Sequence, residues 1–344
     1  KPTDSGNVQS DMKAYATRLV LTLVTVFAFT GCTVMRTENR PAPVSQYDAV
    51  IVDADTGDIL TVAELARQLA NTDVVVTGES HGHHASHLLQ ARLQQALYRH
   101  NPRQILSMEQ FNLNHQDALD AYLAGQTGET EMIEDADAWE NYKASYRPLV
   151  EFAREHQLPV VAANAPADIV RCVGREGMDY LQRLPDAQRA ALPAQAFLDT
   201  PDYRDKFVDA IAGSHGAEQT ELTGRLLSTY QAQLLRDNTM AERILTALNE
   251  HPGHQVLHTT GTFHSEQRLG TVAVLEQRAP ELSIAVLSPV EWSPPEQAMP
   301  VAANRHKGDY LYFILPLPPE YRDAERQRSA MQKRFSRHSD TRCE

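Results

Sequence analysis

The chain has 344 residues, of which 42% are hydrophobic and 22% are charged. This composition is typical of a soluble globular protein, and the length allows one large domain or two ordinary ones. The formal net charge of −13 argues against nucleic-acid binding, because a phosphate backbone requires a basic stripe. The same charge disfavours electrostatic attraction to an anionic membrane surface.

The N-terminal region has the layout of a bacterial lipoprotein signal. A short basic segment at residues 12–18 is followed by the apolar run 19–29, which is too short for a membrane-spanning helix of about 20 residues. Small residues at the end of the run precede Cys32. We expect cleavage before Cys32 and acylation of its thiol, for example with palmitate; an ordinary secretory signal with an incidental cysteine is the alternative.

These features divide the N-terminal part of the chain. We assign residues 1–31 to upstream sequence and signal peptide, with Met12 as the expected start, and residues 32–47 to a polar, lipidated tether. Thr33 directly after the cysteine favours the outer membrane, by analogy with enterobacterial sorting. The expected location is therefore the periplasmic side of the outer membrane.

Two further cysteines, Cys172 and Cys343, remain in the expected mature chain. Two lone cysteines do not make a disulfide framework, and Cys343 lies in a charged tail, 321–344, whose end is expected to be disordered. We therefore expect no structural disulfide.

The body of the chain reads as strands that alternate with helices. Helical spacing of apolar residues and short β-branched runs predict, in chain order, a helix at 62–69, a strand at 73–77, a helix at 88–97, a strand at 104–108, helices at 116–123 and 148–156, and strands at 158–163, 256–260, 282–287 and 310–315. Such alternation predicts an α/β fold with a mainly parallel sheet and helices on both faces. The last strand, before Pro316, is expected at an edge.

One long segment interrupts this alternation. Residues 170–251 lack convincing strands and are rich in Gln, Arg, Ala and Leu, which predicts an inserted helical subdomain. The final helix carries an apolar stripe between Leu227 and Leu248. We therefore expect an α/β core formed by 48–169 and 252–320.

Polar residues follow several predicted strands, where ligands bind in open α/β sheets. Gly78-Glu-Ser-His81 follows the first strand, Glu109 the second, and Gly261-Thr-Phe-His264 the fourth. Imidazole and carboxylate groups together suit a divalent transition metal, for which we propose Glu79, His81 and His264, and a Glu beside a His can act as a general base. The other nearby histidines, His83, His84 and His87, are expected to be solvated loop residues.

Asp237 lies on the apolar stripe of the last helix of the insertion, between Leu234 and Ala241. A carboxylate in that position requires a partner or a role. It is either part of the site at the strand ends or one half of an ion pair that braces the helix against the sheet.

Six segments occur in an order that resembles one known family, the ChaN-like haem-binding lipoproteins. They are Thr77-Gly-Glu-Ser-His81, Met108-Glu-Gln-Phe111, Trp139 through Tyr146-Arg-Pro-Leu149, Pro159-Val-Val-Ala-Ala-Asn-Ala-Pro166, Arg236-Asp-Asn-Thr-Met-Ala241 and Gly261-Thr-Phe-His264. The resemblance covers roughly residues 50–287. It implies a lipid-anchored α/β protein that captures haem in a homodimer, formed on haem binding, around two stacked haems.

The resemblance also implies that a tyrosine binds the haem iron, and a phenolate is a reasonable ligand for ferric haem. We predict Tyr203 as that ligand and His215 as its hydrogen-bonding neighbour or a group from the other protomer. Three tyrosines compete for the role: Tyr142, Tyr146 and Tyr230. The alternative is that Tyr203 only packs its ring in the core.

Two function hypotheses follow, with a ligand-free scaffold lipoprotein as a third. The first is a haem-binding lipoprotein of iron acquisition. The second is a metal-dependent hydrolase, a peptidase or esterase, because the family is distantly similar to Tiki-type metalloproteases and erythromycin esterases, which share paired Gly-x-x-His motifs. Its catalytic residues would be Glu79, His81, Glu109, His264 and Asp237.

Overall fold

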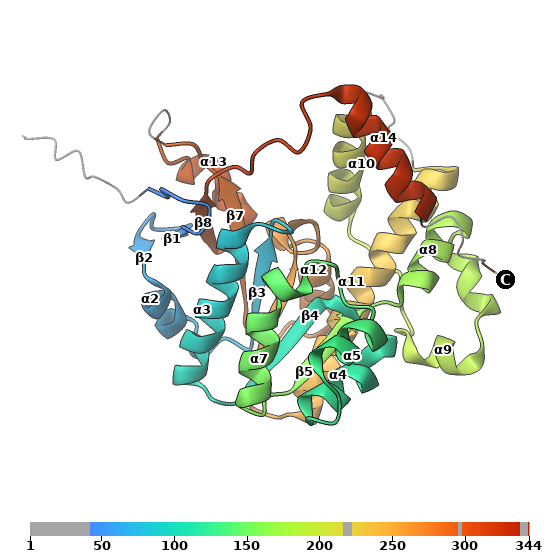
Figure 1. Cartoon of the computed structure of the whole chain (residues 1–344), viewed down its shortest axis with the longest axis horizontal. Helices are drawn as coiled ribbons and strands as arrows, with labels where there is room; N and C mark the ends of the chain where they lie inside the picture. Colours follow the sequence, from blue (N-terminus) through green and yellow to red (C-terminus); the bar gives the residue numbers. More distant parts are fainter. Residues whose placement is uncertain (1–41, 216–221, 295–297, 338–342, 344) are drawn as a thin grey trace, which may run out of the picture. The chain divides into compact units, whose positions relative to one another are not determined.

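Eight strands form one sheet in the computed structural model, which describes residues 42–215, 222–294, 298–337 and 343 (Figure 1). Their order across the sheet is β2-β1-β8-β7-β3-β6-β4-β5. The strands are β1 (Val50–Asp53), β2 (Ile59–Leu60), β3 (Val74–Glu79), β4 (Gln104–Asn112), β5 (Val160–Asn164), β6 (Gln255–Gly261), β7 (Ile284–Glu291) and β8 (Tyr310–Ile314). The six strands from β8 to β5 are parallel, which confirms the predicted α/β fold.

Helices connect the strands and cover both faces of the sheet (Figure 1). The α-helices of the described residues are α2 (Val62–Gln68), α3 (His84–His100), α4 (Gln116–Leu123), α5 (Glu129–Asp135), α6 (Tyr142–Ser145), α7 (Arg147–Glu155), α8 (Ala167–Glu176), α9 (Asp186–Ala191), α10 (Pro201–His215), α11 (Gly224–Glu250), α12 (Thr271–Arg278), α13 (Val301–Asn304) and α14 (Ala324–Arg337). Short 3₁₀ segments are η1 (Leu113–His115), η2 (Met178–Arg183), η3 (Thr262–His264), η4 (Glu266–Arg268) and η5 (Arg305–Lys307).

The alternation of side chains along each strand builds a core on both faces of the sheet. On β3, Val75 packs in the cluster that holds Leu93 of α3 and Leu149 of α7. Its neighbour Val76 packs in a second cluster with Ile244 of α11. Each fully buried side chain of this size stabilises the fold by about 1.5–3 kcal/mol, so the sheet is fixed between two helical layers.

The strand β8 is not at an edge, and that prediction was wrong. It lies between β7 and β1, and β1 pairs with it antiparallel, with Ile51 opposite Tyr312. The real edge on this side is β2, which has two residues. Neither β1 nor β2 is predictable from the sequence, because such short runs carry little periodicity.

The other edge strand, β5, is closed by side chains. The amide of Gln116 donates to the Val160 carbonyl (2.8 Å) and accepts from the Ala162 N–H (2.8 Å), as a backbone peptide of a further strand would. The Nε of Arg243 donates to the Ala162 carbonyl (3.3 Å). Edge strands expose unpaired backbone groups that invite pairing with other chains, and here three of these groups are already bonded.

Between β5 and β6 the described residues form helices only, from α8 to α11. Helix α8 packs on α11 through a small apolar cluster that includes Val173 and Leu235. This packing carries one end of the 27-residue helix α11 over the carboxyl ends of the strands. Among the described residues, none of the helices combines the length and apolar character that a membrane span requires.

A disulfide joins Cys172 on α8 to Cys343, so the expectation of no structural disulfide was wrong. The two cysteines are 171 residues apart, and Cys343 packs against the α8–α11 cluster instead of extending into solvent. The chain after β8 returns through α14 toward the helices between β5 and β6 (Figure 1). Spacing in the sequence does not reveal a pairing that depends on this return path.

Candidate functional site

The two Gly-x-x-His segments lie at the ends of neighbouring parallel strands. Strand β6 lies between β3 and β4, and Glu79 at the end of β3 is in register with Gly261 at the end of β6. Glu109 comes from β4, on the other side of β6. The sheet therefore brings His81, Glu109 and His264 to one edge.

The first part of the site is built around Glu79, which is 1% exposed. Its Oε1 accepts hydrogen bonds from His81 Nδ1 (2.8 Å) and the Tyr146 hydroxyl (2.6 Å), and its Oε2 accepts one from Gln90 Nε2 (2.8 Å). Burial raises the pKa of Glu79, but the hydrogen bond from His81 and the charges of His87 and His81 outweigh it and lower the pKa. Glu79 is thus a buried carboxylate that holds His81 in one orientation.

His81 is the accessible member of this pair, with 47% of its side chain exposed. Burial lowers its pKa, but the hydrogen bond to Glu79 and the charge of Glu109 prevail and raise it. The ring packs edge-on against Trp139, with 5.1 Å between the ring centroids. His81 can therefore meet a ligand from solvent while its Nδ1 stays on Glu79.

The second part of the site is built around Asp237, which is fully buried on α11. Its Oδ1 accepts from His264 Nδ1 (2.8 Å) and Thr271 Oγ1 (2.8 Å), and its Oδ2 accepts from the Tyr203 hydroxyl (2.6 Å). Burial lowers the pKa of His264, but the charges of Asp237 and Glu109 prevail and raise it. Asp237 thus belongs to the site and also braces the helix against the strand ends, which were the two alternatives from sequence.

Glu109 lies between the two histidines. Its Oε2 accepts from Thr260 Oγ1 and the Gly261 N–H, both at 2.7 Å, and its Oε1 is 3.7 Å from His264 Nε2. Burial raises the pKa of Glu109, but the charges of His264 and His81 and these hydrogen bonds outweigh it and lower the pKa to about 2. Glu109 is therefore ionised at any physiological pH.

Gly261 permits this close approach. A Cβ at this position would lie 2.8 Å from His81 Nε2 and 3.7 Å from Glu109 Oε2. The absence of a side chain lets the His81 ring lie over the end of β6. The result is a row of five alternating groups, Glu79–His81–Glu109–His264–Asp237, in which each imidazole has its Nδ1 fixed by a carboxylate. The Nε2 of His264 faces Glu109, and the Nε2 of His81 lies beside Gly261.

This row can support acid–base chemistry, since a carboxylate that orients a histidine through Nδ1 leaves Nε2 to transfer a proton. It does not assemble the predicted metal ligands. Among the residues that the structure describes, no three His, Cys, Asp or Glu side chains are grouped so that they could hold a metal ion. The physical reason is that Glu79 and His264 each bind a different partner, so the proposed set of Glu79, His81 and His264 has no common centre.

The predicted haem ligand, Tyr203, lies inside the site and not at its surface. The side chain is 2% exposed and packs between Tyr230 and Phe263. Burial, together with the charge of Asp237, raises the pKa of Tyr203 well above its usual value. The competing tyrosines are buried as well: Tyr142, Tyr146 and Tyr230. The His215 side chain and Cys32 fall outside the described residues.

Two histidines that were expected to be solvated are in fact structural. His83 is fully buried; its Nδ1 accepts the Ala85 N–H at the start of α3, and its Nε2 donates to the Leu315 carbonyl (2.8 Å). His87 accepts the Gly82 N–H at Nε2 (3.1 Å), which places its proton on Nδ1, 3.6 Å from Glu79. Only His84 of the three is exposed, as expected.

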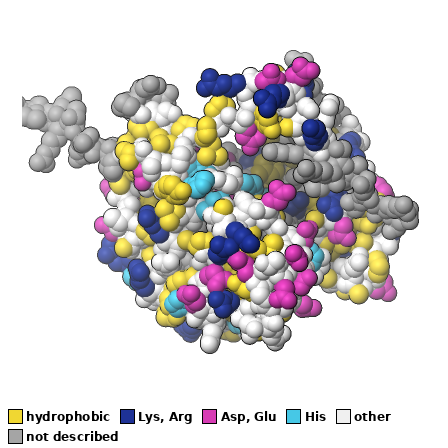
Figure 2. Space-filling view, viewed as in Figure 1, with side chains coloured by type: hydrophobic (Ala, Val, Ile, Leu, Met, Phe, Trp, Pro, Cys, Tyr) yellow, Lys and Arg dark blue, Asp and Glu magenta, His cyan; other side chains and the backbone are white. Residues whose placement is uncertain are grey.

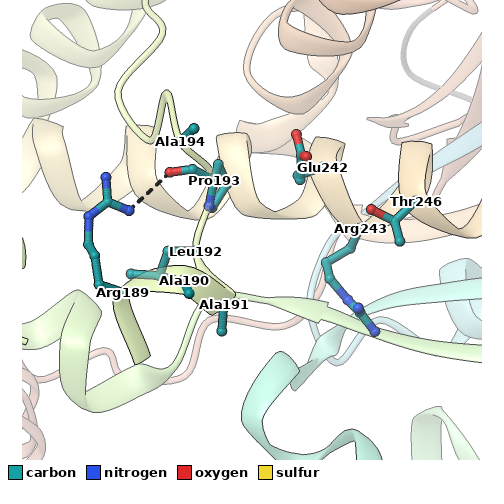
Figure 3. Close-up of a pocket in the computed structure, with 9 residues that line it drawn as sticks. All are labelled: Arg189, Ala190, Ala191, Leu192, Pro193, Ala194, Glu242, Arg243 and Thr246. Carbon is teal, nitrogen blue, oxygen red and sulfur yellow. Dashed lines mark hydrogen bonds between the residues drawn. The ribbon is translucent and has the colours of Figure 1, made fainter. Parts of the chain in front are cut away.

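The row is distinct from one pocket at the surface of the protein. Figure 2 shows histidine side chains at the surface in the middle of the displayed face. A pocket of about 640 Å³ lies instead between the end of α9 and helix α11 (Figure 3). There Arg189 donates to the Pro193 carbonyl (3.2 Å), while Arg243 extends toward the β5 edge that it bonds. No group of the Glu79–Asp237 row lines this pocket.

Comparison with known proteins gives one family match. The family model described as "Haem-binding uptake, Tiki superfamily, ChaN" matches residues 65–275, which include the whole row from Glu79 to His264. No curated protein matches the chain.

Several solved structures align with the chain, and one of them shares its fold. ChaN of Campylobacter jejuni, in a structure with cofacial heme binding, aligns with a TM-score of 0.59 at 17% identity, over 78% of this chain and 98% of that one. A Bacillus cereus protein aligns with a TM-score of 0.44 at 12% identity, over 74% and 92% of the two chains. A mutant of the erythromycin esterase EreC in its open conformation aligns with a TM-score of 0.41 at 12% identity, over 82% and 86%.

Proposed function

The chain belongs to the haem-binding uptake family of the Tiki superfamily, ChaN, and from this membership we propose that it binds haem at the carboxyl edge of its sheet. The observation that carries the proposal is that the matched region, 65–275, contains every residue of the Glu79–Asp237 row. We propose further that haem is cargo of iron acquisition and that a homodimer forms when it binds.

The residues at the edge fit such a ligand. His81 offers a half-exposed imidazole, and the Trp139 ring beside it offers an aromatic surface for a porphyrin. Tyr203 remains the predicted iron ligand. To bind as a phenolate it must leave Asp237 and lose its proton, and its raised pKa opposes this step unless ferric iron replaces the proton.

We expect the purified protein to show a ferric-haem absorbance change that saturates near one haem per chain and is accompanied by dimer formation on size exclusion. Tyr203→Phe should remove the phenolate signature from the spectrum, whereas Tyr230→Phe should retain it. His81→Ala should weaken haem binding by roughly tenfold or more, the worth of one charge-assisted contact. His156→Ala, at an exposed histidine on a different part of the surface, is the control.

Two outcomes would count against this assignment in different ways. No spectral change at micromolar haem refutes haem binding altogether. A normal spectrum for Tyr203→Phe keeps the function and removes Tyr203 as the ligand.

The proposed location is the periplasmic side of the outer membrane, with the chain anchored by a lipid on Cys32. The basic segment, the apolar run and the cysteine at its end support this proposal. Mass spectrometry of the protein from a bacterial membrane fraction should find acyl chains on Cys32, and Cys32→Ser should release the protein from that fraction. Retention of the serine variant in the membrane would contradict the anchor.

A second candidate function, hydrolysis, is favoured by the two histidine–carboxylate pairs at this edge, one of which faces Glu109. In that case His264 would act as a general base, oriented by Asp237. The protein should then hydrolyse an activated ester, with His264→Gln at least about 100-fold slower. Activity that is equal in the variant would identify a contaminant or another site.

A further inference from the structure

Two arginines near the row have no partner among the described residues. Arg171 lies on α8 and Arg236 on α11, and both are half-buried. Neither forms a hydrogen bond or an ion pair within 4.0 Å with any residue that the structure describes, and the Nε of Arg171 is buried without a partner. By contrast, every histidine and carboxylate of the row forms at least one hydrogen bond.

The fold brings the two arginines toward each other and toward the row. Helices α8 and α11 pack closely where Gly174 meets Ala232, with 3.5 Å between the two Cβ positions. Arg171 comes about one helical turn before this contact on α8, and Arg236 about one turn after it on α11, so both lie on its strand-end side. Arg236 directly precedes Asp237. Its charge acts on His81 and His264 as well as on Glu109.

The nearby carboxylates do not serve as hydrogen-bond acceptors for Arg171 and Arg236. Asp237 already accepts three hydrogen bonds, and Glu109 accepts two and faces His264. Each guanidinium carries five N–H donors. One buried acceptor without a partner lies at the end of β5, the Oδ1 of Asn164. The region therefore has far more donors than acceptors.

The charges give the same result. Arg171 and Arg236 add two positive charges beside the three carboxylates of the row, each of which already accepts hydrogen bonds from other groups. The whole chain has a formal charge of −13. The two guanidinium groups are thus the part of this edge that attracts an anionic group.

We propose that Arg171 and Arg236 bind the carboxylate groups of the ligand, which on haem are its two propionates. The inference rests on the proposed haem function and adds the residues that orient the haem. A planar guanidinium matches a carboxylate through two parallel hydrogen bonds. Binding would supply the acceptors that the arginines lack and would fix one edge of the porphyrin over α8 and α11, next to His81.

The test compares haemin with its dimethyl ester, in which the propionates carry no charge. We expect the wild-type protein to bind haemin more tightly than the ester. Arg171→Gln and Arg236→Gln should each weaken haemin binding by roughly 10- to 100-fold, the worth of a hydrogen-bonded charge pair, and leave ester binding unchanged. Arg225→Gln, at an exposed arginine of the same helix α11, removes the same charge and should bind both as wild type does.

Further measurements separate this inference from the proposed function and from misfolding. If the arginine variants bind haemin as wild type does, the inference is overturned and haem binding stands. If wild type binds no haemin, thermal stabilisation by succinate, relative to chloride at equal ionic strength, tests the arginines alone. If the variant that carries both Arg171→Gln and Arg236→Gln loses that stabilisation, the carboxylate site is supported. If succinate still stabilises this variant, the carboxylate site is overturned. Circular dichroism checks the fold, and Arg236→Lys should restore part of the affinity.

Discussion

Replacing Gly270 with alanine is expected to lower the free energy of unfolding by roughly 2–6 kcal/mol and to detach His264 from Asp237. Gly270 has φ +59° and ψ −124°, a combination that is open to glycine and costs other residues about 1–3 kcal/mol. A Cβ would also lie 2.8 Å from Asp237 Oδ1, 2.8 Å from the His264 carbonyl oxygen and 2.9 Å from His264 Cα. Two of these atoms belong to the His264 backbone in η3, so that segment must shift, and such overpacking costs about 1–3 kcal/mol more.

Urea unfolding of Gly270→Ala and of Gly57→Ala separates the cost of backbone strain from the cost of the close contacts. Gly57 also has a positive φ, +77°, but nothing lies within 4 Å of its Cβ position, so its replacement should cost only the backbone strain of about 1–2 kcal/mol. Histidine NMR of Gly270→Ala should show His264 with a lower pKa than in wild type, because the Asp237 contact raises it. Equal costs for the two variants would disprove the role of the close contacts.

Glu109→Gln is expected to lower the free energy of unfolding by about 3–5 kcal/mol at neutral pH, since it leaves buried positive groups without their shared carboxylate. Glutamine keeps an acceptor for the hydrogen bonds from Thr260 and Gly261. The loss in free energy of unfolding therefore comes mainly from removal of the negative charge. The groups that lose the negative charge of Glu109 are His264, His81 and Arg236. Glu129→Gln, which breaks a more exposed ion pair with Arg147, should cost less than about 1 kcal/mol.

The pH dependence gives a second readout of the same substitution. The pKa of Glu109 falls from its ordinary 4.5 to about 2 in the folded protein. A carboxyl group whose folded pKa is depressed stabilises the fold above its unfolded pKa and loses that contribution as the pH falls to the folded pKa. The difference between wild type and Glu109→Gln should therefore be largest above pH 4.5 and shrink between pH 4.5 and about 2. A difference that is constant over this range would show that Glu109 acts by packing alone.

Much of the fold could be predicted because its signals are local. The β-branched runs before Glu79 and Gly261 lie in the buried centre of the sheet, where continuous apolar runs are required. Parallel pairing then places whatever follows these strands at one edge. That is why His81, Glu109 and His264 could be grouped without knowledge of their contacts. Asp237 could be singled out because a carboxylate on an apolar stripe needs a partner.

The remaining parts of the site depend on contacts across the fold. Tyr146 reaches Glu79 from the junction of α6 and α7, and Gln90 reaches it from α3. His87 resembles an ordinary helical polar residue in sequence, and only the Gly82 N–H on its ring reveals its role. In sequence Tyr203 is one available phenol among several, but its hydroxyl is bonded inside the site, to a residue 34 positions away. Such partners have no signature in residue spacing.

The amide of Gln116 limits how two copies of this chain can associate. It occupies the outward-facing groups of Val160 and Ala162, so the sheet cannot be continued from one protomer into the next at β5. At the opposite border the two residues of β2 give too short a template for a neighbouring chain. The proposed homodimer would therefore have to be held by side chains and by the ligand between its protomers, which would make its assembly depend on that ligand.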